Sequence, residues 1–396
     1  MRHREGSRGG GREPSPKRPP YRVLLLTNVK QAVLQAYLEP LAALEEVAEV
    51  VVIRDRADVE VGPKVRVIAP HQQWPLAVGL KLICRGLLMR QHVAGADLLM
   101  TLHWFPDGPM VVRWGRRLGI PVVANIIGSR AELIGGGRRI ALAPLPDWAK
   151  HWAETYQRRW LNRASAVTYT GQATADWFRA AGIMEPEPFV LHAAVESGGS
   201  CDPESARTTD VAYIGRIHPD KRVDRLFATL AALGRGRPGT IAEIVGMGSE
   251  DAERFPAYHA ARLALGTGLR LYQRVDSVEP ILGRSKVLLL TSDTEGRTLA
   301  VLEAMAAGAV PVVTDVGDLA EALGMGKAGI VVPLEEEEES LVTALAHQVI
   351  TLLKDERRRQ TLADYGSRCV RREHARSSAS QDWRRVIEAV TGGGVK

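Results

Sequence analysis

Two glutamates, Glu295 and Glu303, bracket a short apolar run in EGRTLAVLEAMAAG (295–308). The preceding VLLLTS has the pattern of a buried strand, and the apolar residues after Glu295 recur at helical spacing as far as Gly308. We therefore expect Glu295 in a strand-to-helix loop and Glu303 on the helix. Unpaired amides at a helix start bind anions readily, and those expected here belong to Gly296, Arg297, Thr298 and Leu299.

This spacing suits a ligand with phosphate groups in its middle. Five residues of helix rise by roughly 7–8 Å, so the two carboxylates can meet groups on opposite sides of a bound phosphate. A nucleotide sugar, with ribose, diphosphate and sugar in that order, has this shape. Most pairs of glutamates are ordinary surface carboxylates of an amphipathic helix, so the pair needs support from other motifs.

A pair of cations follows another expected strand. In YIGRIHPDKRVDRLF (213–227) the strand ends at Gly215, Arg216 comes next, and Lys221 precedes a helical run. Ligands of parallel sheets bind at the carboxyl ends of the strands, where the fork of an arginine and the point charge of a lysine would suit a diphosphate. The alternative is a solvated basic loop in a chain with 52 Lys and Arg.

A third loop, IVGMGSED (244–251), carries Gly246 and Gly248 after a strand, which allows the backbone to approach a ligand closely. Asp251 stands where a dinucleotide-binding fingerprint would need a third glycine. The loop therefore predicts a tight strand end and is weak support for a dehydrogenase.

The length of 396 residues favours two domains, and a composition of 45% hydrophobic and 25% charged residues is typical of a soluble globular protein. The net charge of +6 is concentrated in the N-terminal half. The cysteines, Cys84, Cys201 and Cys369, are odd in number and form no C-x-x-C pair, which argues against both a disulfide framework and a zinc site. A reducing cytosol fits this cysteine usage.

Apolar runs of eighteen or more residues are absent from the sequence, so a membrane-spanning helix is excluded. We expect a cytoplasmic protein, with peripheral attachment at the inner face of the membrane as the second option. Residues 1–20 are rich in Arg, Gly and Pro and predict a disordered basic tail, or an over-long choice of start codon.

Short buried strand patterns alternate with helical stretches in two series, beginning with YRVLLLTN (21–28) and DVAYIG (210–215). This alternation predicts two parallel-sheet α/β domains. The predicted units are the tail, a first domain at 21–195, a linker at 196–209, a second domain at 210–375, and a C-terminal helix at 376–396 that packs back toward the first domain.

Together these motifs resemble the retaining glycosyltransferases of the GT-B fold, in particular the large family four that includes sucrose synthases and bacterial mannosyl- and glucosyltransferases. The matching stretches run in the family's order through the C-terminal half and are YIGRIHPDKRVD, AEIVGMGSE, LTSDTEGRTLAVLEAMAAGAVPVVTDVG and KAGIVVP. The third is highly specific. The resemblance implies two Rossmann-like domains that face a central cleft, the first binding the acceptor and the second the nucleotide sugar.

Carried over residue by residue, the resemblance implies that Arg216 and Lys221 neutralise the donor diphosphate and that Glu303 binds the ribose hydroxyls. Glu295 would hold the donor sugar and stabilise charge near the anomeric carbon. The base would lie between the loops at Gly246 and at 273–275. Further donor-binding positions are implied at Gly215, Gly248, Arg274, Gly296, Arg297, Thr298 and Leu299. Family members need no metal and no cofactor, because the cations replace a divalent ion.

The N-terminal half resembles the family more loosely. TNVKQAV (27–33) lacks the usual glycine pair, and Ile127 stands where a histidine that touches the donor sugar often precedes the glycine. The acceptor-side positions implied are His103, Gly128 and Ser129. A histidine beside two aromatic residues, as His103 is, more often packs in the core, and His192 near the linker is expected to be structural.

The stretch PLAVGLKLICRGLLMRQHV (75–93) mixes apolar residues with Lys81, Arg85 and Arg90. It predicts either a peripheral membrane contact for a lipid-linked acceptor or, as the favoured alternative, an amphipathic core helix whose cations reach the surface. The sequence shows no nucleic-acid-binding motif.

We therefore expect a metal-independent hexosyltransferase that moves a sugar from a nucleoside diphosphate to a glycan, a lipid-linked glycan or a small molecule, with retention of the anomeric centre. The alternatives are a degenerate GT-B scaffold subunit without turnover and, less favoured, a GT-B epimerase or phosphorylase.

Overall fold

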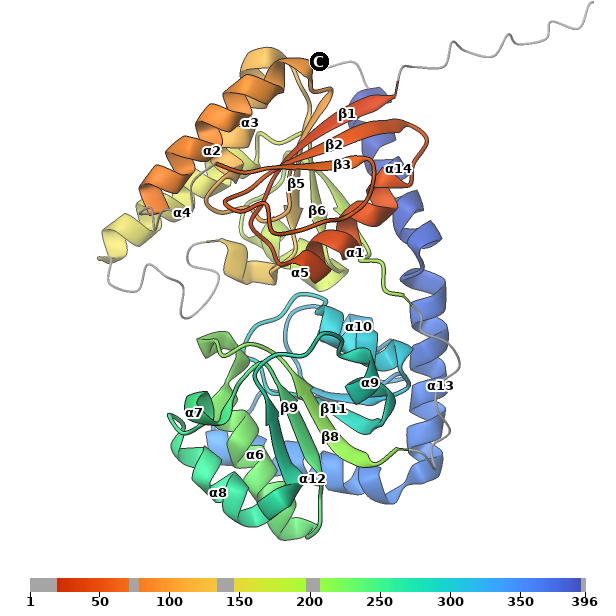
Figure 1. The fold of residues 1–396 in the computed structure, drawn as a ribbon. Coiled ribbons are helices and arrows are strands. Elements are labelled where there is room, and N and C mark those ends of the chain that lie inside the picture. Colours follow the sequence, from red (N-terminus) through yellow and green to blue (C-terminus); the bar gives the residue numbers. More distant parts are fainter. Residues whose placement is uncertain (1–19, 71–77, 134–145, 197–206, 393–396) are drawn as a thin grey trace, which may run out of the picture.

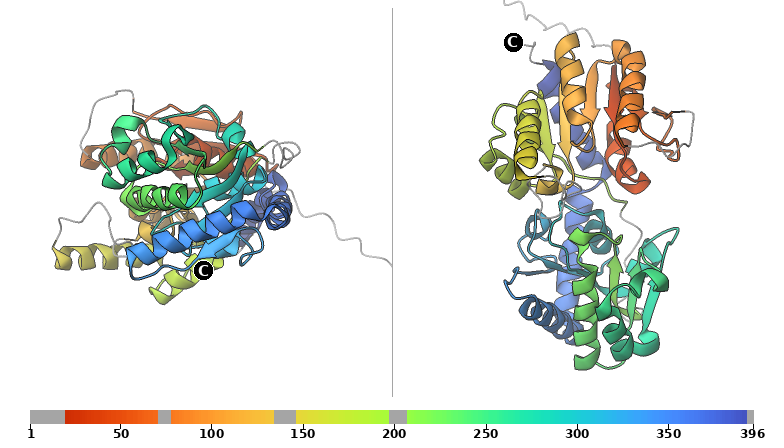
Figure 2. Two further views of the ribbon diagram at one scale, coloured as in Figure 1. Left: turned by 90° about the horizontal axis from the view of Figure 1, so that it is seen from below. Right: turned by 90° about the vertical axis from the view of Figure 1, so that its left-hand side faces the viewer.

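The computed structural model describes residues 20–70, 78–133, 146–196 and 207–392. These residues form two domains, one above the other in Figure 1, and each is built on a parallel sheet covered by helices. Figure 2 shows the same two domains and their helices from two further directions. The predicted α/β class with two parallel-sheet domains is confirmed. Cys201, the predicted disordered tail up to residue 19 and most of the predicted linker lie outside the described residues.

The N-terminal sheet has the strand order β3-β2-β1-β4-β5-β6-β7. Its strands are β1 (Tyr21–Leu26), β2 (Val47–Ile53), β3 (Val65–Ile68), β4 (Leu98–Thr101), β5 (Val122–Ile126), β6 (Ala166–Tyr169) and β7 (Glu187–Val190). Its helices are α1 (Gln31–Ala42), α2 (Val78–His92), α3 (Gly108–Leu118), α4 (Asp147–Leu161) and α5 (Gln172–Ala180), with short 3-10 turns η1 (Val93–Gly95) and η2 (Ser129–Glu132). Val23 and Leu25 of β1 pack into one hydrophobic cluster, and Leu24 and Leu26 into another. The strand is thus buried on both faces, as its continuous apolar run predicts.

The C-terminal sheet has the strand order β10-β9-β8-β11-β12-β13. Its strands are β8 (Thr209–Ile214), β9 (Ala242–Val245), β10 (Leu269–Tyr272), β11 (Ser285–Leu290), β12 (Val310–Thr314) and β13 (Ile330–Val332). Its helical elements are η4 (Pro219–Lys221), α6 (Val223–Gly236), α7 (Ser249–Ala252), α8 (Pro256–Leu265), η5 (Gly266–Gly268), α9 (Glu279–Gly283), α10 (Leu299–Ala306), α11 (Leu319–Ala322), α12 (Glu338–Lys354) and α13 (Glu356–Glu373). One continuous cluster of buried side chains forms the core of this domain.

The strand order of the C-terminal sheet reverses between β8 and β11, which pair directly with Val287 opposite Val211. In open parallel sheets, ligands bind beyond the carboxyl ends of the strands at such a reversal. Arg216 and Lys221 follow β8, and Glu295 follows β11. The topology therefore brings three of the predicted site residues to one place.

The chain crosses between the domains twice. The first crossing segment begins after β7 with residues 191–196. The second runs from the end of α13, which lies along the C-terminal domain, to the start of α14 (Arg376–Gly392) (Figure 1). Helix α14 packs against α1 of the N-terminal domain, where the fully buried Trp383 donates a hydrogen bond of 2.8 Å to the Tyr37 carbonyl. The last helix thus belongs to the core of the first domain.

Helix α2 differs from the favoured expectation for residues 75–93. Arg85 does not reach the surface: it is buried and forms ion pairs of 2.9 Å with Asp107 and 2.5 Å with Asp55. Ile83 and Leu87 are instead 60% and 56% exposed. The prediction of a core helix with its cations in water is therefore wrong for Arg85, because the buried carboxylate of Asp107 supplies a partner that a sequence pattern does not reveal.

Candidate functional site

An ion pair between Lys221 and Glu295 lies at the sheet reversal. Lys221 Nζ donates to Glu295 Oε1, and the Ser292 hydroxyl donates to the same oxygen over 2.6 Å. The loops that carry the pair are joined by a backbone hydrogen bond of 2.8 Å from Asp293 to Asp220. Glu295 is only 7% exposed, so this carboxylate is held in one position by a cation and a hydroxyl.

Arg216 and Arg274 place positive charge beyond the carboxyl ends of strands β8 and β10 of the same sheet. Both side chains are exposed, and neither has an ion-pair partner among the residues that the structure describes. Gly246 follows β9, the strand that lies between β8 and β10. It has a φ of +110°, and a β-carbon added to it would lie 2.0 Å from the Gly215 carbonyl oxygen. The loops after β8 and β9 therefore touch, and Gly246 is required for that close approach. Gly248 follows in the same loop, where an added β-carbon would make only ordinary contact with Gln273.

Helix α10 begins at Leu299, as its sequence pattern predicts, with Thr298 as an extended N-cap residue whose side chain makes no capping hydrogen bond. The amides of its first turn can therefore serve a ligand. Arg297 does not face such a ligand freely, because its guanidinium is buried and pairs with Glu321 over 2.7 Å. Gly296 lies against the N-terminal domain, where an added β-carbon would meet the Ile127 carbonyl oxygen at 2.7 Å.

A cleft of about 1200 Å³ lies beside this site, between the two domains. It is lined by α1, by the first crossing segment, by α9 and by α10, on which Glu303 faces the space. Burial raises the pKa of Glu303 above its ordinary value of 4.5. No hydrogen bond to the Glu303 side chain occurs within the described part of the chain. Glu303 is thus a desolvated acceptor that lines an open space, which suits recognition of hydroxyl groups.

We expect the Glu303→Gln variant to have a higher melting temperature than the unsubstituted protein at neutral pH. Because the pKa is raised on folding, the folded state holds the proton at pH values where the unfolded chain has lost it, so stability falls as pH rises above 4.5. The variant has no such dependence, and the difference should vanish at or below pH 4.5. Calorimetry between pH 4 and pH 8 measures it, with Glu279→Gln, an exposed position in the same cleft, as control. Equal melting temperatures for the two variants at pH 7.5 would contradict it.

The acceptor-side positions Gly128 and Ser129 follow β5 and are organised by Glu132, which sequence analysis missed. The buried Glu132 carboxylate accepts hydrogen bonds from the backbone amides of Trp104 and Ile127, each 2.7 Å, and from that of Gly128. Ser129 adopts a positive φ of 62°. The sequence held only a partial signal. S-x-x-E at 129–132 matches a capping box, but Glu132 accepts from the amides of Ile127 and Gly128 and not from that of Ser129.

Asp318 and Glu321 of the C-terminal domain hold the two domains together at this side of the cleft. Asp318 is fully buried and accepts from the Thr174 amide (2.8 Å) and from the hydroxyls of Thr174 (2.7 Å) and Thr170 (2.5 Å). Glu321 accepts from the Gln172 amide over 2.7 Å. Helix α5 has Gly171 at its N-cap, which offers no side chain, so carboxylates from the other domain cap it. No sequence signal indicated this contact.

His103 and His192, the two histidines considered in the sequence analysis, have different surroundings. His103 does not pack in the core as favoured: its side chain is exposed, and its Nδ1 lies 2.8 Å from the Phe105 carbonyl oxygen. His192 is half-buried in the first crossing segment, with its Nδ1 2.7 Å from Asp382 Oδ2. His192 is therefore part of the contact between that segment and α14, away from the β5 loop.

Two doubly wound domains that face a cleft, with cations and carboxylates at the strand reversal of the second, define the GT-B class of glycosyltransferases. The C-terminal domain matches the Glycosyl transferases group 1 family over residues 203–368, and the N-terminal domain matches the Glycosyl transferase 4-like domain over residues 31–193. Together the matches cover most of the chain, which therefore belongs to the GT-B glycosyltransferases of this type.

Curated relatives and solved structures agree with this class. Glycogen synthase of Mycobacterium tuberculosis is 26% identical over 83% of this chain and 80% of its own length. Phosphatidyl-myo-inositol mannosyltransferase of Mycolicibacterium smegmatis is 31% identical over 49% of this chain and 48% of its own. Sucrose-phosphate synthase from Thermosynechococcus elongatus superposes with a TM-score of 0.74 at 16% identity, covering 94% and 99% of the two chains. Anabaena HepE in complex with UDP-glucose superposes with a TM-score of 0.69 at 17% identity, covering 93% and 100%.

Proposed function

We propose that this glycosyltransferase transfers a hexose from a nucleoside diphosphate sugar to its acceptor with retention of the anomeric configuration and without a catalytic metal. The observation that carries the proposal is the Lys221–Glu295 pair at the sheet reversal, beside the cleft that Glu303 lines. In this arrangement Glu303 receives the ribose hydroxyls, the cations receive the diphosphate, and Glu295 faces the sugar.

The chemistry at the anomeric carbon follows from the state of Glu295. Its carboxylate is buried and engaged by Lys221 and Ser292, so it is poorly placed to attack the sugar as a free nucleophile. A front-face displacement, in which the departing phosphate oxygen accepts the proton of the acceptor hydroxyl, needs no protein nucleophile. Retention by double displacement would instead leave a glycosyl-enzyme that mass spectrometry could detect after denaturing quench.

The cations support independence from a catalytic metal. Arg216 is exposed and without an ion-pair partner in the described residues, and Lys221 is 20% exposed at its side chain. Both can therefore approach a diphosphate and stabilise the charge that develops on the leaving group. Closure of the cleft would exclude water that otherwise hydrolyses the donor.

The alternative is a subunit that keeps the nucleotide cleft but does not turn over. Ile127 favours it, because an aliphatic side chain cannot make the polar contact to the donor sugar that the resemblance implies for a histidine at this position. The pair of Lys221 and Glu295 favours an enzyme, because it lies at the reversal of strand order, where parallel sheets bind their ligands. Turnover of a donor by the purified protein decides between them.

A thermal-shift panel with UDP, GDP, ADP and CDP, each with and without EDTA, tests the proposed donor site. A nucleotide at one hundred times its dissociation constant adds about 2.7 kcal/mol to the free energy of unfolding. We expect one nucleotide to give this shift, EDTA not to change the shift, and Glu303→Ala and Arg216→Ala to weaken binding by at least about tenfold. The proposal would be overturned by the absence of a shift with all four nucleotides.

We also propose that the outer helices of the N-terminal domain attach the enzyme to the membrane, which would give it access to a lipid-linked acceptor. No helix of the described residues is long and apolar enough to span a bilayer. Helices α2, α3 and α4 lie side by side on one face of the sheet (Figure 1, Figure 2). Besides the exposed apolar residues of α2, Trp148 and Trp152 of α4 are 75% and 66% exposed.

Positive charge accompanies these apolar side chains. Arg113, Arg116 and Arg117 of α3, together with Trp160 of α4, line a surface hollow of about 380 Å³. Exposed tryptophans with neighbouring cations are typical of surfaces that lie in the interface of an anionic membrane. One relative is named for phosphatidyl-myo-inositol, a membrane lipid, which agrees with attachment to a membrane.

Sedimentation with phosphatidylglycerol vesicles tests the membrane contact. We expect the double variant Trp148→Ala, Trp152→Ala to bind the vesicles at least about tenfold more weakly, because two large side chains no longer enter the bilayer interface. Leu263→Ala, at an 89% exposed position in the other domain, is the matched control and should bind normally. Equal binding by both variants, or no binding by the unsubstituted protein, contradicts the proposed surface.

A further inference from the structure

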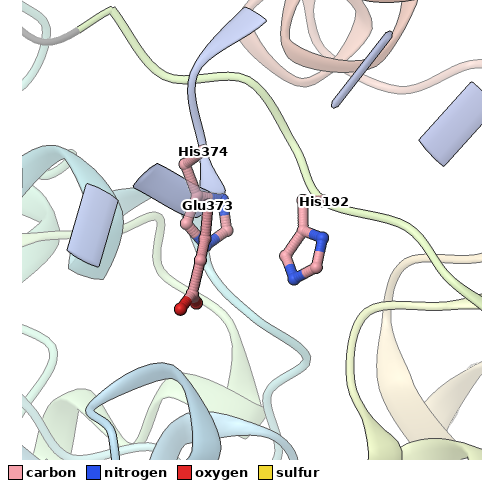
Figure 3. A group of neighbouring side chains, drawn as sticks. All are labelled: His192, Glu373 and His374. Atoms are coloured by element: carbon pink, nitrogen blue, oxygen red, sulfur yellow. The ribbon is translucent and has the colours of Figure 1, made fainter. Parts of the chain in front are cut away.

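Two histidines and a glutamate meet where the chain crosses between its domains. His192 comes from the first crossing segment, and Glu373 and His374 come from the second crossing, at the end of α13 (Figure 3). One nitrogen of each ring and one carboxylate oxygen all lie within 4.8 Å of one another. These three side chains take no part in the donor site described above, so their proximity calls for a separate explanation.

Hydrogen bonds fix the orientation of both rings. His374 Nδ1 lies 2.8 Å from the Ala193 carbonyl oxygen, which can only accept, so Nδ1 carries the proton and Nε2 keeps a lone pair. His192 Nδ1 lies 2.7 Å from Asp382 Oδ2, and this carboxylate also accepts from the His192 amide. In each ring the nitrogen without a hydrogen bond in the described structure is Nε2.

This pattern is the one that surrounds metal-ligating histidines. Such residues donate one ring N–H to a carboxylate or a backbone carbonyl, which sets the tautomer and raises the basicity of the other nitrogen. Here His192 has the carboxylate of Asp382 and His374 has the carbonyl of Ala193. Two imidazoles and one carboxylate form a donor set that zinc and related divalent ions accept, with water in the fourth position.

We propose that His192, Glu373 and His374 bind a divalent transition-metal ion of the zinc type, which joins the two crossing segments at the hinge between the domains. Zinc bonds of about 2.0–2.1 Å place tetrahedral ligands about 3.3 Å apart, so side-chain shifts of about 1 Å complete the site. Glu373 Oε1 accepts from Arg372 over 2.5 Å, whereas Oε2 has only the weak thiol of Cys369 at 3.4 Å. Oε2 is thus the oxygen that the ion takes.

An ion at this place would act on the hinge. The two crossing segments are also joined by the hydrogen bond from His374 to Ala193 and by one of 2.9 Å from the Val195 amide to the His374 carbonyl. An ion pair of 4.0 Å between Arg376 and Glu196 adds a further connection. Val195 and Ala375, next to the proposed ligands, also line the cleft between the domains. The ion fixes one edge of the cleft, which then acts as the hinge for rotation of the domains. It takes no part in the proposed sugar transfer.

The competing explanation is packing alone, since the two rings meet edge to face with centroids 5.1 Å apart. Isothermal titration calorimetry with Zn²⁺ distinguishes metal binding from packing alone. The protein carries no tag, and it is treated with EDTA and desalted before the titration. We expect one ion per chain, and binding at least about tenfold weaker in His192→Gln and in Glu373→Gln. His192→Gln changes a half-buried side chain and Glu373→Gln a partly exposed one, so both variants should fold.

His347→Gln, at an exposed position on α12, is the control for adventitious binding and should bind Zn²⁺ like the unsubstituted protein. Co²⁺ bound in place of Zn²⁺ should give visible absorption in the unsubstituted protein. His192→Gln and Glu373→Gln should lack this absorption. Addition of Zn²⁺ should raise the melting temperature of the unsubstituted protein and of His347→Gln, but not that of His192→Gln. The site is overturned if Zn²⁺ does not bind, or if it binds all three variants and the unsubstituted protein equally.

Discussion

Replacing Glu295 with glutamine is expected to lower kcat/KM for sugar transfer by about 10²–10³-fold, the effect of removing one preorganised charge from a reacting centre. Glutamine has nearly the same shape and still accepts the hydrogen bond of Ser292, so the loop after β11 should keep its position. The substitution removes the negative charge that we propose to lie next to the donor sugar, and it leaves Lys221 without its ion-pair partner. Steady-state kinetics with the donor identified in the thermal-shift panel measure the effect.

Two further measurements separate loss of chemistry from loss of folding. Affinity for the nucleoside diphosphate should change less than turnover, because Glu303 and Arg216 are unaltered. Glu336→Gln, which changes the same residue type at an exposed position, should retain full activity. If Glu295→Gln kept more than a tenth of the activity of the unsubstituted enzyme, the role assigned to Glu295 would be wrong.

The Asp318→Ala substitution is expected to release the contact between the domains. It leaves the Thr174 amide and the hydroxyls of Thr170 and Thr174 without their buried acceptor. Each unsatisfied group costs about 1–3 kcal/mol unless water reaches it, so the docked arrangement should lose about 3 kcal/mol or more. Small-angle scattering should then show a larger radius of gyration, and calorimetry a lower melting temperature for the domain that contains α5.

Asp315→Ala provides the control for this experiment. Asp315 lies in the same loop after β12, but its side chain is exposed. Its replacement should leave both the radius of gyration and the melting temperature unchanged. If Asp318→Ala behaved in the same way, the hydrogen bonds of Asp318 would not be what holds the domains together.

The strands of both sheets could be predicted to differing degrees. Those at the centre, such as β1 and β11, are buried on both faces and appear as continuous apolar runs. The edge strands β3 and β7 of the N-terminal sheet were not predicted, because VRVI is a strand pattern of only four residues and EPFV contains a proline. Their pairing depends on the neighbouring strands β2 and β6, to which they add.

For the candidate site, the sequence alone predicted where those residues lie whose placement depends on local spacing. Glu295, Glu303 and the α10 amides belong to one strand-loop-helix segment, and Arg216 and Lys221 to another. Within each segment, strand and helix geometry sets where the side chains lie, and the carboxyl end of a parallel strand is the usual place for a ligand. The class of protein therefore followed from short stretches of sequence.

Only the tertiary structure decided which of these groups meet and what surrounds them. The pairing of Lys221 with Glu295, the capping of α5 by Asp318 and the cluster of His192, Glu373 and His374 each join segments far apart in the chain. Such contacts depend on the strand order and on how two domains pack. Neither leaves a periodic pattern, because periodicity records only which side of its own element a residue faces.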